Sequence, residues 1–539
     1  MAITRRKLIG AMARLGGAGA AYETLAAWNF LKPPDARAAS LALPEDSGAG
    51  RTIAILGAGV AGLCAAYELD RAGYDCVILE AAQRLGGRSL TLRRGDRFAE
   101  MGGPPQECRF DEGLWLNAGP GRIPHHHVQV IDYCRRFGVA LQPFIFHSRA
   151  NLVHSGHIGN GKTMQMRRAL HDLQGHVAEL LDKCVAKGDL DLPVTGTDVE
   201  KLRDMLATFG DLTKADAGGK RTYSYRNKSG RAGYEVPPGL ADQPGQPLSP
   251  LALDEILRSE VWNDYIFRDA EYYWQASLLE PVSGMDNFVR AFARQKLRRQ
   301  AGTIANLIRY GARVTAVDVA ADKVTIAYHE GSGARTLAAD YCVSTIPAPI
   351  FRRLKTNLPT VYMEAAARLP VQAAGKVGWQ ADRFWEMKDQ IFGGISWTTD
   401  VITQVWYPSS GFLGAKGVLT GAYMYGADAD QFNAKPVAER LHIAREQGDR
   451  LHPGYADWVE HGIAIGWNNM EFARFGWADE GDETFAAHAQ MLSRPQGRFH
   501  MAGDQLTYWS GWQEGALISA LAAVKSIDRQ VNPTATRRG

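Results

Sequence analysis

A glycine-rich turn between an apolar run and a helical segment is the clearest place for chemistry in this sequence of 539 residues. The run 52–56 is short, β-branched and uncharged, as a strand buried on both faces should be. Gly57, Gly59 and Gly62 follow it with G-x-G-x-x-G spacing, which allows a tight turn, close approach of the backbone to a pyrophosphate, and tight packing of the next helix. That helix starts near Val60 and presents its N-terminal amides to the phosphates. The segment therefore predicts a dinucleotide site.

An acidic residue and a basic loop extend this prediction. A second buried strand, 76–79, ends in Glu80, where a carboxylate can bind the hydroxyls of an adenosine ribose. An acid at this position argues against a 2′-phosphate. Two arginines and two glycines follow: Arg84, Gly86, Gly87 and Arg88. Their loop can wrap a pyrophosphate from its other side and neutralise its charge.

Together these residues form a GAGxxGL…E…R.GGR run near the N-terminus, which resembles the flavin amine oxidase family and its L-amino acid oxidase-like branch. The resemblance implies FAD as the cofactor. It also implies FAD contacts from a Glu-x-Gly-Gly turn that begins at Glu100 and from the backbone of a strand valine. In this part of the chain the implied FAD-binding residues are Gly57, Ala58, Gly59, Gly62, Glu80, Ala81, Arg84, Gly86, Gly87, Arg88, Gly102, Gly103, Pro104 and Val314.

A C-terminal motif completes the implied FAD site. A strand at 499–504 delivers Asp504 to a turn, and the aromatic run 508–516 precedes an apolar helix whose N-terminal amides can stabilise negative charge on a reduced flavin. The family usually has Glu at the position of Asp504, which is implied to hold ribityl hydroxyls. The implied FAD contacts here are Gly503, Asp504, Gly511, Trp512, Gln513 and Ala516, and those bordering the substrate are Trp509, Gly511 and Trp512.

The substrate class follows from the segment 118–125, which resembles the G-x-x-R-[IL]-P-x-H element of L-amino acid oxidases. In that branch the arginine, here Arg122, binds the α-carboxylate of the substrate, a task suited to a planar guanidinium. Arg109 is a rival clamp, because an inserted stretch through residue 117 separates the Glu100 turn from Arg122.

Two further strands resemble family elements. A strand tyrosine of the family donates its hydroxyl to the same carboxylate, and Tyr423 takes that position. Tyr425 lies two residues on, hence on the same strand face. Lys376, in an apolar strand-like context before Phe384 and Trp385, matches the family lysine that holds a water at flavin N5. Lys376 and Arg122 are therefore the implied catalytic residues.

The implied reaction converts an L-amino acid, O2 and water to a 2-oxo acid, ammonia and hydrogen peroxide, by hydride transfer from the α-carbon to flavin N5. Three alternatives stay open. A monoamine or polyamine oxidase would not need Arg122 for a carboxylate. An amino-acid 2-monooxygenase would give an amide instead of a 2-oxo acid. A non-catalytic flavoprotein would keep the cofactor for stability.

Composition and net charge limit the classes of partner that the chain is expected to bind. A net charge of +3 over this length implies neither a nucleic-acid nor a membrane footprint, and the six cysteines lack metal-like spacing. The three histidines 125–127 are adjacent, so their side chains point in different directions and predict no metal site. A homodimer is suggested only by the resemblance.

The N-terminus resembles a twin-arginine export signal at residues 4–9, followed by an Ala/Gly-rich stretch and a cleavage candidate at 36–38. Arg14 and Glu23 interrupt that stretch, which argues against a stable membrane span. The expected location is periplasmic or secreted, through the twin-arginine machinery, or cytoplasmic if the signal does not function. Export of a folded protein suits an enzyme that acquires FAD in the cytoplasm.

The expected fold is a mixed α/β class: a Rossmann-like FAD-binding domain built from discontinuous segments, a mixed-sheet substrate domain and a helical insertion. Helical spacing at 164–184 and 251–276, with a loop-like stretch at 214–250 between, defines the insertion. The expected boundaries are 1–49 for the export signal and linker, 50–117 with 281–350 and 490–530 for the FAD domain, 118–150 with 351–489 for the substrate domain, 151–280 for the insertion and 531–539 for a tail.

Overall fold

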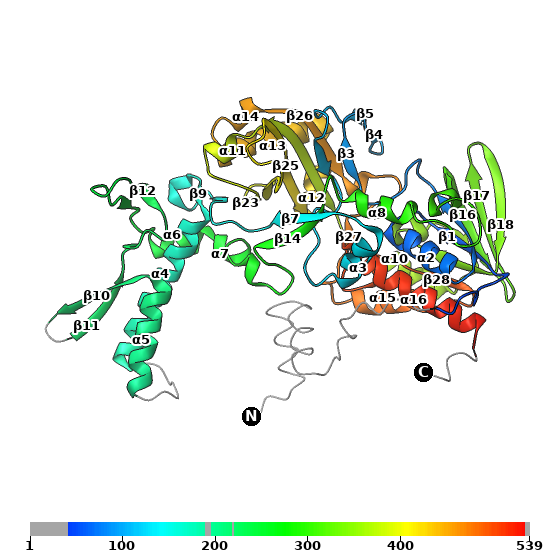
Figure 1. The fold of residues 1–539 in the computed structure, drawn as a ribbon, viewed down its shortest axis with the longest axis horizontal. Helices are drawn as coiled ribbons and strands as arrows, with labels where there is room; N and C mark the ends of the chain where they lie inside the picture. Colours follow the sequence, from blue (N-terminus) through cyan, green and yellow to red (C-terminus); the bar gives the residue numbers. More distant parts are fainter. Residues whose placement is uncertain (1–40, 42, 189–195, 218–219, 534–539) are drawn as a thin grey trace.

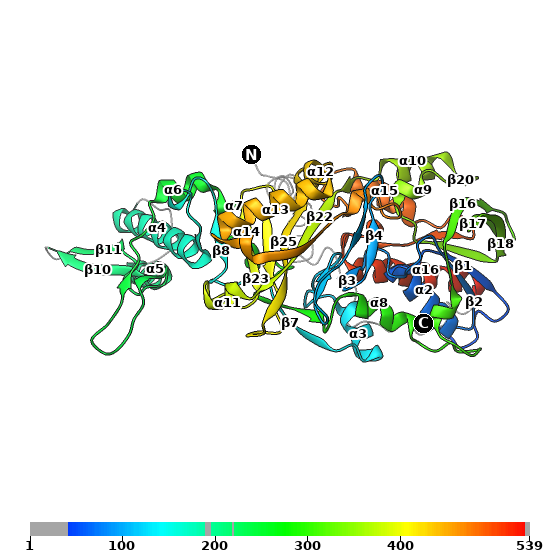
Figure 2. The same ribbon diagram turned by 90° about the horizontal axis from the view of Figure 1, so that it is seen from above.

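The structure is a computed structural model that describes residues 41, 43–188, 196–217 and 220–533. Two bodies, each built around a sheet, lie side by side, and an arm formed by residues 166–188, 196–217 and 220–225 projects from them (Figure 1). Figure 2 shows the same elongated arrangement from above. The fold is the mixed α/β class that the sequence predicts.

The first body is built on a five-stranded sheet in which every pairing is parallel. In order across the sheet the strands are β15 (Ile308–Tyr310), β2 (Asp75–Glu80), β1 (Thr52–Leu56), β19 (Tyr341–Ser344) and β28 (Phe499–Met501). Ile53 and Ile55 of β1 face one hydrophobic core, and Ala54 and Leu56 face another. Both faces are covered, which explains why the run 52–56 has no charge.

Helices pack on one face of this sheet and a second sheet packs on the other. Helices α2 (Val60–Arg71) and α16 (Gln513–Val531) contact each other and contribute Leu63 and Leu517 to one core. The four-stranded sheet is ordered β18 (Gly333–Ala339), β17 (Val324–Glu330), β16 (Ala312–Val319), β20 (Lys355–Thr356), and it shares the other core with α10 (Thr360–Arg368) and α15 (Phe485–Ser493). The FAD-type strand–turn–helix therefore sits on a fully packed scaffold.

The second body contains a seven-stranded mixed sheet. Its order is β26 (Val459–Gly466), β22 (Ala374–Asp382), β25 (Lys416–Tyr425), β24 (Gln404–Tyr407), β23 (Gly394–Thr398), β8 (Leu152–His154) and β9 (Met164–Gln165). Helices α12 (Gly426–Asn433) and α13 (Val437–Leu451) pack against it. On the antiparallel strands β22 and β25, Lys376 is the direct partner of Tyr423. Directly opposite residues point to the same face, so the sheet places these two side chains together.

The insertion is less helical than its sequence predicts. Helix α4 (Met166–Lys187) lies where helical spacing predicts it, and α5 (Gly196–Gly210) follows. The helix expected at 251–276 is wrong in extent: the chain forms only α6 (Leu253–Ser259) and α7 (Val261–Asp264), because Glu260 between them has a φ of 55° that no α-helix accommodates. The loop-like stretch contains hairpin strands: β10 (Leu212–Ala217) with β11 (Lys220–Tyr225), and β12 (Tyr234–Val236) with β13 (Gln246–Pro247).

The stretch inserted before Arg122 folds as its own hairpin. Strands β3 (Thr91–Arg93) and β6 (Trp115–Asn117) pair, and between them β4 (Arg97–Ala99) and β5 (Pro105–Glu107) pair in turn. Glu100 at the β4–β5 turn is buried and accepts hydrogen bonds from Arg440 Nη1 at 3.0 Å and Nη2 at 2.6 Å. This buried ion pair ties the hairpin to α13 of the second body.

Smaller elements complete the bodies. They are α3 (Val128–Phe137), β7 (Leu141–Ile145), β14 (Ser277–Pro281), α8 (Asp286–Ala293), α9 (Ala348–Phe351), β21 (Val371–Gln372), α11 (Phe384–Met387), α14 (Tyr455–Trp458) and β27 (Trp477–Ala478). All six cysteines are free. Within the described ranges no helix is long and apolar enough to cross a membrane. The predicted export signal falls at 1–40, outside those ranges.

Candidate active site

One cavity of about 1330 Å³ runs from the turn after β1 to the face of the seven-stranded sheet that carries Lys376. At one end it is lined by the glycine-rich turn and the loop behind Glu80. At the other end it is lined by aromatic rings, Arg122 and Lys376. The two bodies therefore share a single cavity, with nucleotide-type groups at one end and an apolar, cationic chamber at the other.

The nucleotide end brings together most of the residues predicted for it. Those that line the cavity are Gly57, Gly59, Glu80, Ala81, Arg84, Gly86, Gly87, Arg88, Val314, Gly503, Asp504, Gly511, Trp512, Gln513 and Ala516. Glu80 Oε2 accepts the Ala58 amide at 2.7 Å, and Oε1 accepts the Ala82 amide at 2.8 Å. Burial raises the pKa of this carboxyl, and the two amides oppose that rise. The acid is fixed at the end of β2 by backbone donors.

The glycines of this turn fall into two groups, which differ in the atoms that an added Cβ would contact. A Cβ at Gly62 would lie 2.0 Å from the Gly57 carbonyl oxygen, so Gly62 allows α2 to pack on the turn, and it does not line the cavity. A Cβ at Gly59 would meet no atom within 4 Å, because Gly59 faces the open cavity. Gly59 is also the N-cap of α2 and carries no side-chain cap, and Val60 and Ala61 behind it line the cavity. Uncapped amides at an open helix N-terminus suit a phosphate.

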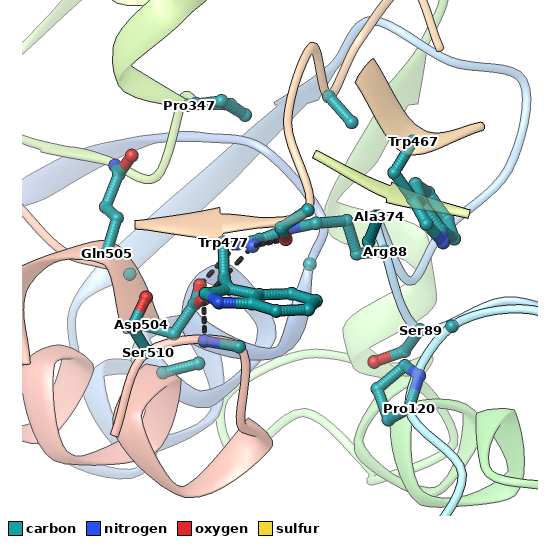
Figure 3. Close-up of a pocket in the computed structure, with 18 of the residues that line it drawn as sticks. Arg88, Ser89, Pro120, Pro347, Ala374, Trp467, Trp477, Asp504, Gln505 and Ser510 are labelled. Carbon is teal, nitrogen blue, oxygen red and sulfur yellow. Dashed lines mark hydrogen bonds and ion pairs between the residues drawn. The ribbon is translucent and has the colours of Figure 1, made fainter. Parts of the chain in front are cut away.

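Asp504 is already engaged by protein groups. Arg88 Nη1 donates to its Oδ2 at 3.0 Å, Arg88 Nη2 bonds its Oδ1, and the Gly511 amide donates to Oδ2 at 2.8 Å. Figure 3 shows this pair beside Trp477 and Ser510. Asp504 thus joins the C-terminal turn to the loop behind Glu80, so that both sides of the cavity are held together.

The predicted Glu-x-Gly-Gly turn lies off the cavity lining, and its contact with FAD stays a prediction. Among the described residues, Gly102, Gly103 and Pro104 do not line the cavity, and Gly102 and Pro104 are exposed. The second body holds this turn, because Glu100 pairs with Arg440 of α13 and the Met101 amide donates to the carbonyl oxygen of Asn469 at 2.9 Å. The residues just before Arg122 line the cavity instead: Ala118, Gly119, Pro120 and Gly121. Their own Ala-Gly-Pro-Gly pattern was the available signal.

Lys376 is a buried ammonium held by two backbone oxygens. Its Nζ donates to the carbonyls of Asn117 at 2.8 Å and Gly119 at 2.6 Å. Nζ also lies 4.6 Å from the ring centroid of Trp406 and 5.2 Å from that of Tyr423. Burial, and next the positive charge of Arg122, lower the pKa of Lys376 well below its ordinary value. These hydrogen bonds therefore fix Lys376 of β22 to the chain segment just before Arg122.

Arg122 lies in a cage of four aromatic rings, with its Cζ at 4.5 Å from the Trp406 centroid, 4.6 Å from Trp274, 5.4 Å from Phe146 and 5.8 Å from Trp512. Its Nε is buried and has no hydrogen-bond partner, and within the described chain no carboxylate pairs with the guanidinium. Burial lowers the pKa of Arg122 to about 10. Its rival Arg109 is exposed and lies off the cavity lining.

The remaining predicted substrate residues also line the chamber. Tyr423 and Tyr425 have ring centroids 6.0 Å apart, as neighbours on one strand face should, and burial raises the pKa of Tyr423 to about 12. Trp509 and Trp512 both line the cavity. Sequence reasoning missed three cage rings: Phe146, Trp274 and Trp406. Of these three rings, only Trp406 lies in a segment whose β-strand sequence pattern could have indicated a place in the sheet.

In the described ranges no group of three or more His, Cys, Asp or Glu side chains lies together as metal ligands would. The centroids of the His126 and Trp509 rings lie 4.9 Å apart with the rings tilted by 37°, and the His127 ring meets Trp512 edge-on at 4.9 Å. His126 and His127 therefore pack behind the cavity-lining rings of Trp509 and Trp512 and do not line the cavity themselves.

Sequence comparisons place relatives along nearly the whole chain. The family model described as flavin containing amine oxidoreductase matches residues 60–528. The flavin-dependent L-tryptophan oxidase RebO of Lentzea aerocolonigenes is 28% identical over 504 residues, covering 89% of this chain and 98% of that protein. An L-amino-acid oxidase of Daboia russelii is 26% identical over 486 residues, covering 88% and 89%.

Solved structures share the fold. A putrescine oxidase bound to putrescine aligns with a TM-score of 0.55 at 17% identity, covering 88% of this chain and 98% of its own. Cyclohexylamine oxidase from Brevibacterium oxydans aligns with a TM-score of 0.56 at 18% identity, covering 89% and 99%. At these identities the likeness concerns the fold.

The two kinds of glycine give a matched pair of variants. Gly59→Ala should fold with the wild-type melting temperature as apoprotein yet bind FAD at least about tenfold more weakly, because its methyl group enters the space where the backbone meets a phosphate. Gly62→Ala should lower the apoprotein melting temperature itself. Thermal unfolding and FAD titration check both, and equal losses of apoprotein stability in the two variants would contradict this division.

Proposed function

The chain belongs to the flavin-containing amine oxidoreductase family, and from that premise we propose that it oxidises an L-amino acid with O2 and water to a 2-oxo acid, ammonia and hydrogen peroxide. The cofactor is FAD. The groups suited to hold it are the uncapped amides at the start of α2, the Glu80 carboxylate and the arginines behind it. When bound, FAD accepts the hydrogen and electron pair from the substrate carbon.

The unpaired guanidinium of Arg122 carries this proposal. A cation removed from water is costly unless an anion or hydrogen-bond acceptors compensate it, and the four rings compensate it only in part. A carboxylate that enters the chamber supplies the missing anion and can accept two parallel hydrogen bonds from the planar group. An amine without a carboxylate leaves the charge of Arg122 uncompensated. The chamber therefore favours amino acids over simple amines.

Tyr423 and Lys376 complete the proposed machinery. Tyr423, whose pKa is raised, keeps its phenolic proton at neutral pH and can donate it to the same carboxylate. Lys376 Nζ donates one hydrogen bond to the carbonyl of Asn117 and one to that of Gly119. Its third position carries either a proton or a lone pair. We propose that this third position holds a proton at the reacting end of the chamber, because reduction of O2 to peroxide takes up two protons.

The names of the relatives support the same substrate class, because two of them are called an L-tryptophan oxidase and an L-amino-acid oxidase. The aromatic walls of the chamber suit apolar side chains. Measurement of the products separates the alternatives: 2-oxo acid with peroxide supports the oxidase, an amide indicates a monooxygenase, and turnover of amines alone indicates an amine oxidase.

Arg122→Ala should lower kcat/KM for the best L-amino acid by about 10²–10³-fold, because the carboxylate loses a charge-assisted bidentate partner. Arg109→Ala is the matched control and should leave the kinetics unchanged, since Arg109 is exposed. The measurement is a peroxide assay over the L-amino acids, with 2-oxo acid quantified alongside. If Arg122→Ala kept wild-type kinetics on the best substrate while Arg109→Ala did not, the carboxylate assignment would be wrong.

Lys376→Met should lower kcat by about 10²–10⁴-fold and also flatten its pH dependence. Because the pKa of Lys376 is lowered, the protonated form persists only below that lowered pKa and is lost as pH rises through it. Wild-type turnover should therefore fall at rising pH along a limb that the Met variant lacks. Lys435→Met, which removes a surface lysine, is the control. A Met variant that retained the wild-type pH profile would exclude Lys376 as the proton holder.

A further inference from the structure

A buried carboxylate behind the cavity wall joins the segment that carries Arg122 to the helix after the C-terminal turn. Glu514, in the first turn of α16, is 3% exposed and does not line the cavity. Its Oε1 accepts the Gln129 amide at 3.0 Å, and its Oε2 accepts the Val130 amide at 2.9 Å. Both amides belong to the first turn of α3, which begins at Val128. Glu514 thus connects two segments that are distant in sequence.

These two hydrogen bonds give α3 a cap that its own segment does not provide. The N-cap residue of α3, His127, makes no side-chain cap hydrogen bond, and the first turn of α3 contains no acidic residue. Gln129 and Val130 occupy the second and third positions of the helix, whose amides an N-cap side chain normally binds. Glu514 therefore caps α3 from another helix.

Backbone groups alone compensate the charge of Glu514 within the described chain. Burial raises the pKa of Glu514 to about 7, and the amides of Gln129 and Val130 oppose that rise. Glu514 also lies in the first turn of its own helix, so the positive ends of two helix dipoles meet at its carboxylate. Losing either bond leaves a buried polar group unpaired, which is costly. The carboxylate therefore fixes the position of α3 relative to α16.

The segment that carries Arg122 has polar anchors on both bodies. Before Arg122, Lys376 of β22 and the indole of Trp467, which follows β26, donate to backbone carbonyls at residues 117–119. After Arg122, the carboxylate of Glu514 holds the start of α3. Helix α16, which carries Glu514, contacts α2 and α3 in the first body (Figure 1). Glu514 is thus the charged anchor of this segment on the first body.

An aromatic contact at the same junction leads directly to the cage of Arg122. The His127 ring, at the N-cap of α3, meets Trp512 edge-on at 4.9 Å, and Trp512 is the N-cap residue of α16. The Trp512 centroid lies 5.8 Å from Arg122 Cζ. A shift of α3 relative to α16 would therefore move both Arg122 and one ring of its cage.

The start of α16 is fixed in turn to the nucleotide end of the cavity. Gln513 Nε2 donates to Ser89 Oγ at 3.0 Å, in the loop behind Glu80. Gln513 and Ala516, on either side of Glu514 in the chain, line the cavity. The first turn of α16 is therefore part of the wall that the cofactor faces, and its grip on α3 sets the place of the substrate end relative to that wall.

We propose that Glu514 is a positioning residue for substrate binding, because by capping α3 from α16 it holds Arg122 where the guanidinium receives a carboxylate. This inference rests on the proposed function, in which that carboxylate belongs to the substrate. Glu514 lies off the cavity lining, so it acts through the segment that it holds. Its replacement should weaken carboxylate binding and leave FAD binding nearly unchanged.

Titration of the FAD-loaded full chain with benzoate tests the proposal, with the flavin absorbance as the readout. Benzoate combines a carboxylate with a flat ring, which matches the guanidinium and the aromatic walls of the chamber. Glu514→Gln keeps the size of the side chain but turns an amide donor toward one of the two α3 amides. This variant should raise the benzoate Kd by at least about fivefold, with the FAD Kd within about twofold of wild type.

Steady-state kinetics should show the same division. For the best L-amino acid, Glu514→Gln should raise KM by about the same factor as the benzoate Kd, while kcat stays within about threefold of wild type. Glu68→Gln is the matched control, because Glu68 is also buried and bonds α3 through the Tyr133 hydroxyl, away from the first turn of that helix. The control should leave the benzoate Kd and KM unchanged.

Arg122→Ala separates failure of this inference from failure of the proposed function. If Arg122→Ala weakens benzoate binding and Glu514→Gln does not, the positioning role is wrong and the carboxylate assignment stands. If Arg122→Ala binds benzoate like wild type, the carboxylate assignment fails and the inference fails with it. Equal weakening by Glu68→Gln would indicate a general effect of loosening α3 and would also overturn the inference.

Glu514→Asp decides the case if Glu514→Gln does not load FAD. The Asp variant keeps the charge but withdraws the carboxylate from α3 by one methylene. A raised benzoate Kd at an unchanged FAD Kd supports the positioning role, and a wild-type benzoate Kd overturns it.

Discussion

The arrangement of the site depends on two basic side chains that share one apolar chamber. Arg122 sits among four rings and Lys376 is held by two carbonyls, and no carboxylate of the described chain pairs with either. Burial in this poorly solvated space lowers the pKa of both groups, and the charge of Arg122 lowers the pKa of Lys376 further. Such a chamber is stabilised by an incoming anion. Under the proposed function, the carboxylate of the substrate is the anion that compensates Arg122.

The fold holds these two basic side chains at a fixed place relative to the nucleotide end. Antiparallel pairing sets Lys376 opposite Tyr423, and the Lys376 ammonium then fastens the chain segment that ends in Arg122. Arg88 and Asp504 tie the glycine-rich side of the cavity to the start of α16. Because each link joins segments distant in sequence, the cavity is formed only when the two bodies are both folded and docked.

Local features of the site were predictable and long-range ones were not. The strand–turn–helix around Gly59 and the strand pair at Tyr423 follow from spacing that each segment carries by itself. The place of the turn at Gly102 was not predictable, because it depends on the long-range pairing of Glu100 with Arg440, which holds the turn off the cavity lining. The ring of Trp274 reaches Arg122 from the insertion, a contact that only tertiary structure brings about.

The most direct test of the central claim is anaerobic reduction of the bound FAD by an L-amino acid and by its decarboxylated amine, compared at equal concentration. L-phenylalanine or L-tryptophan and the corresponding arylethylamine share the side chain and differ only in the carboxylate that Arg122 is expected to bind. The account predicts rapid bleaching of the flavin absorbance by the amino acid, with reduction by the amine slower by about a hundredfold or more. Equal rates with the two reductants, or faster reduction by the amine, would contradict it.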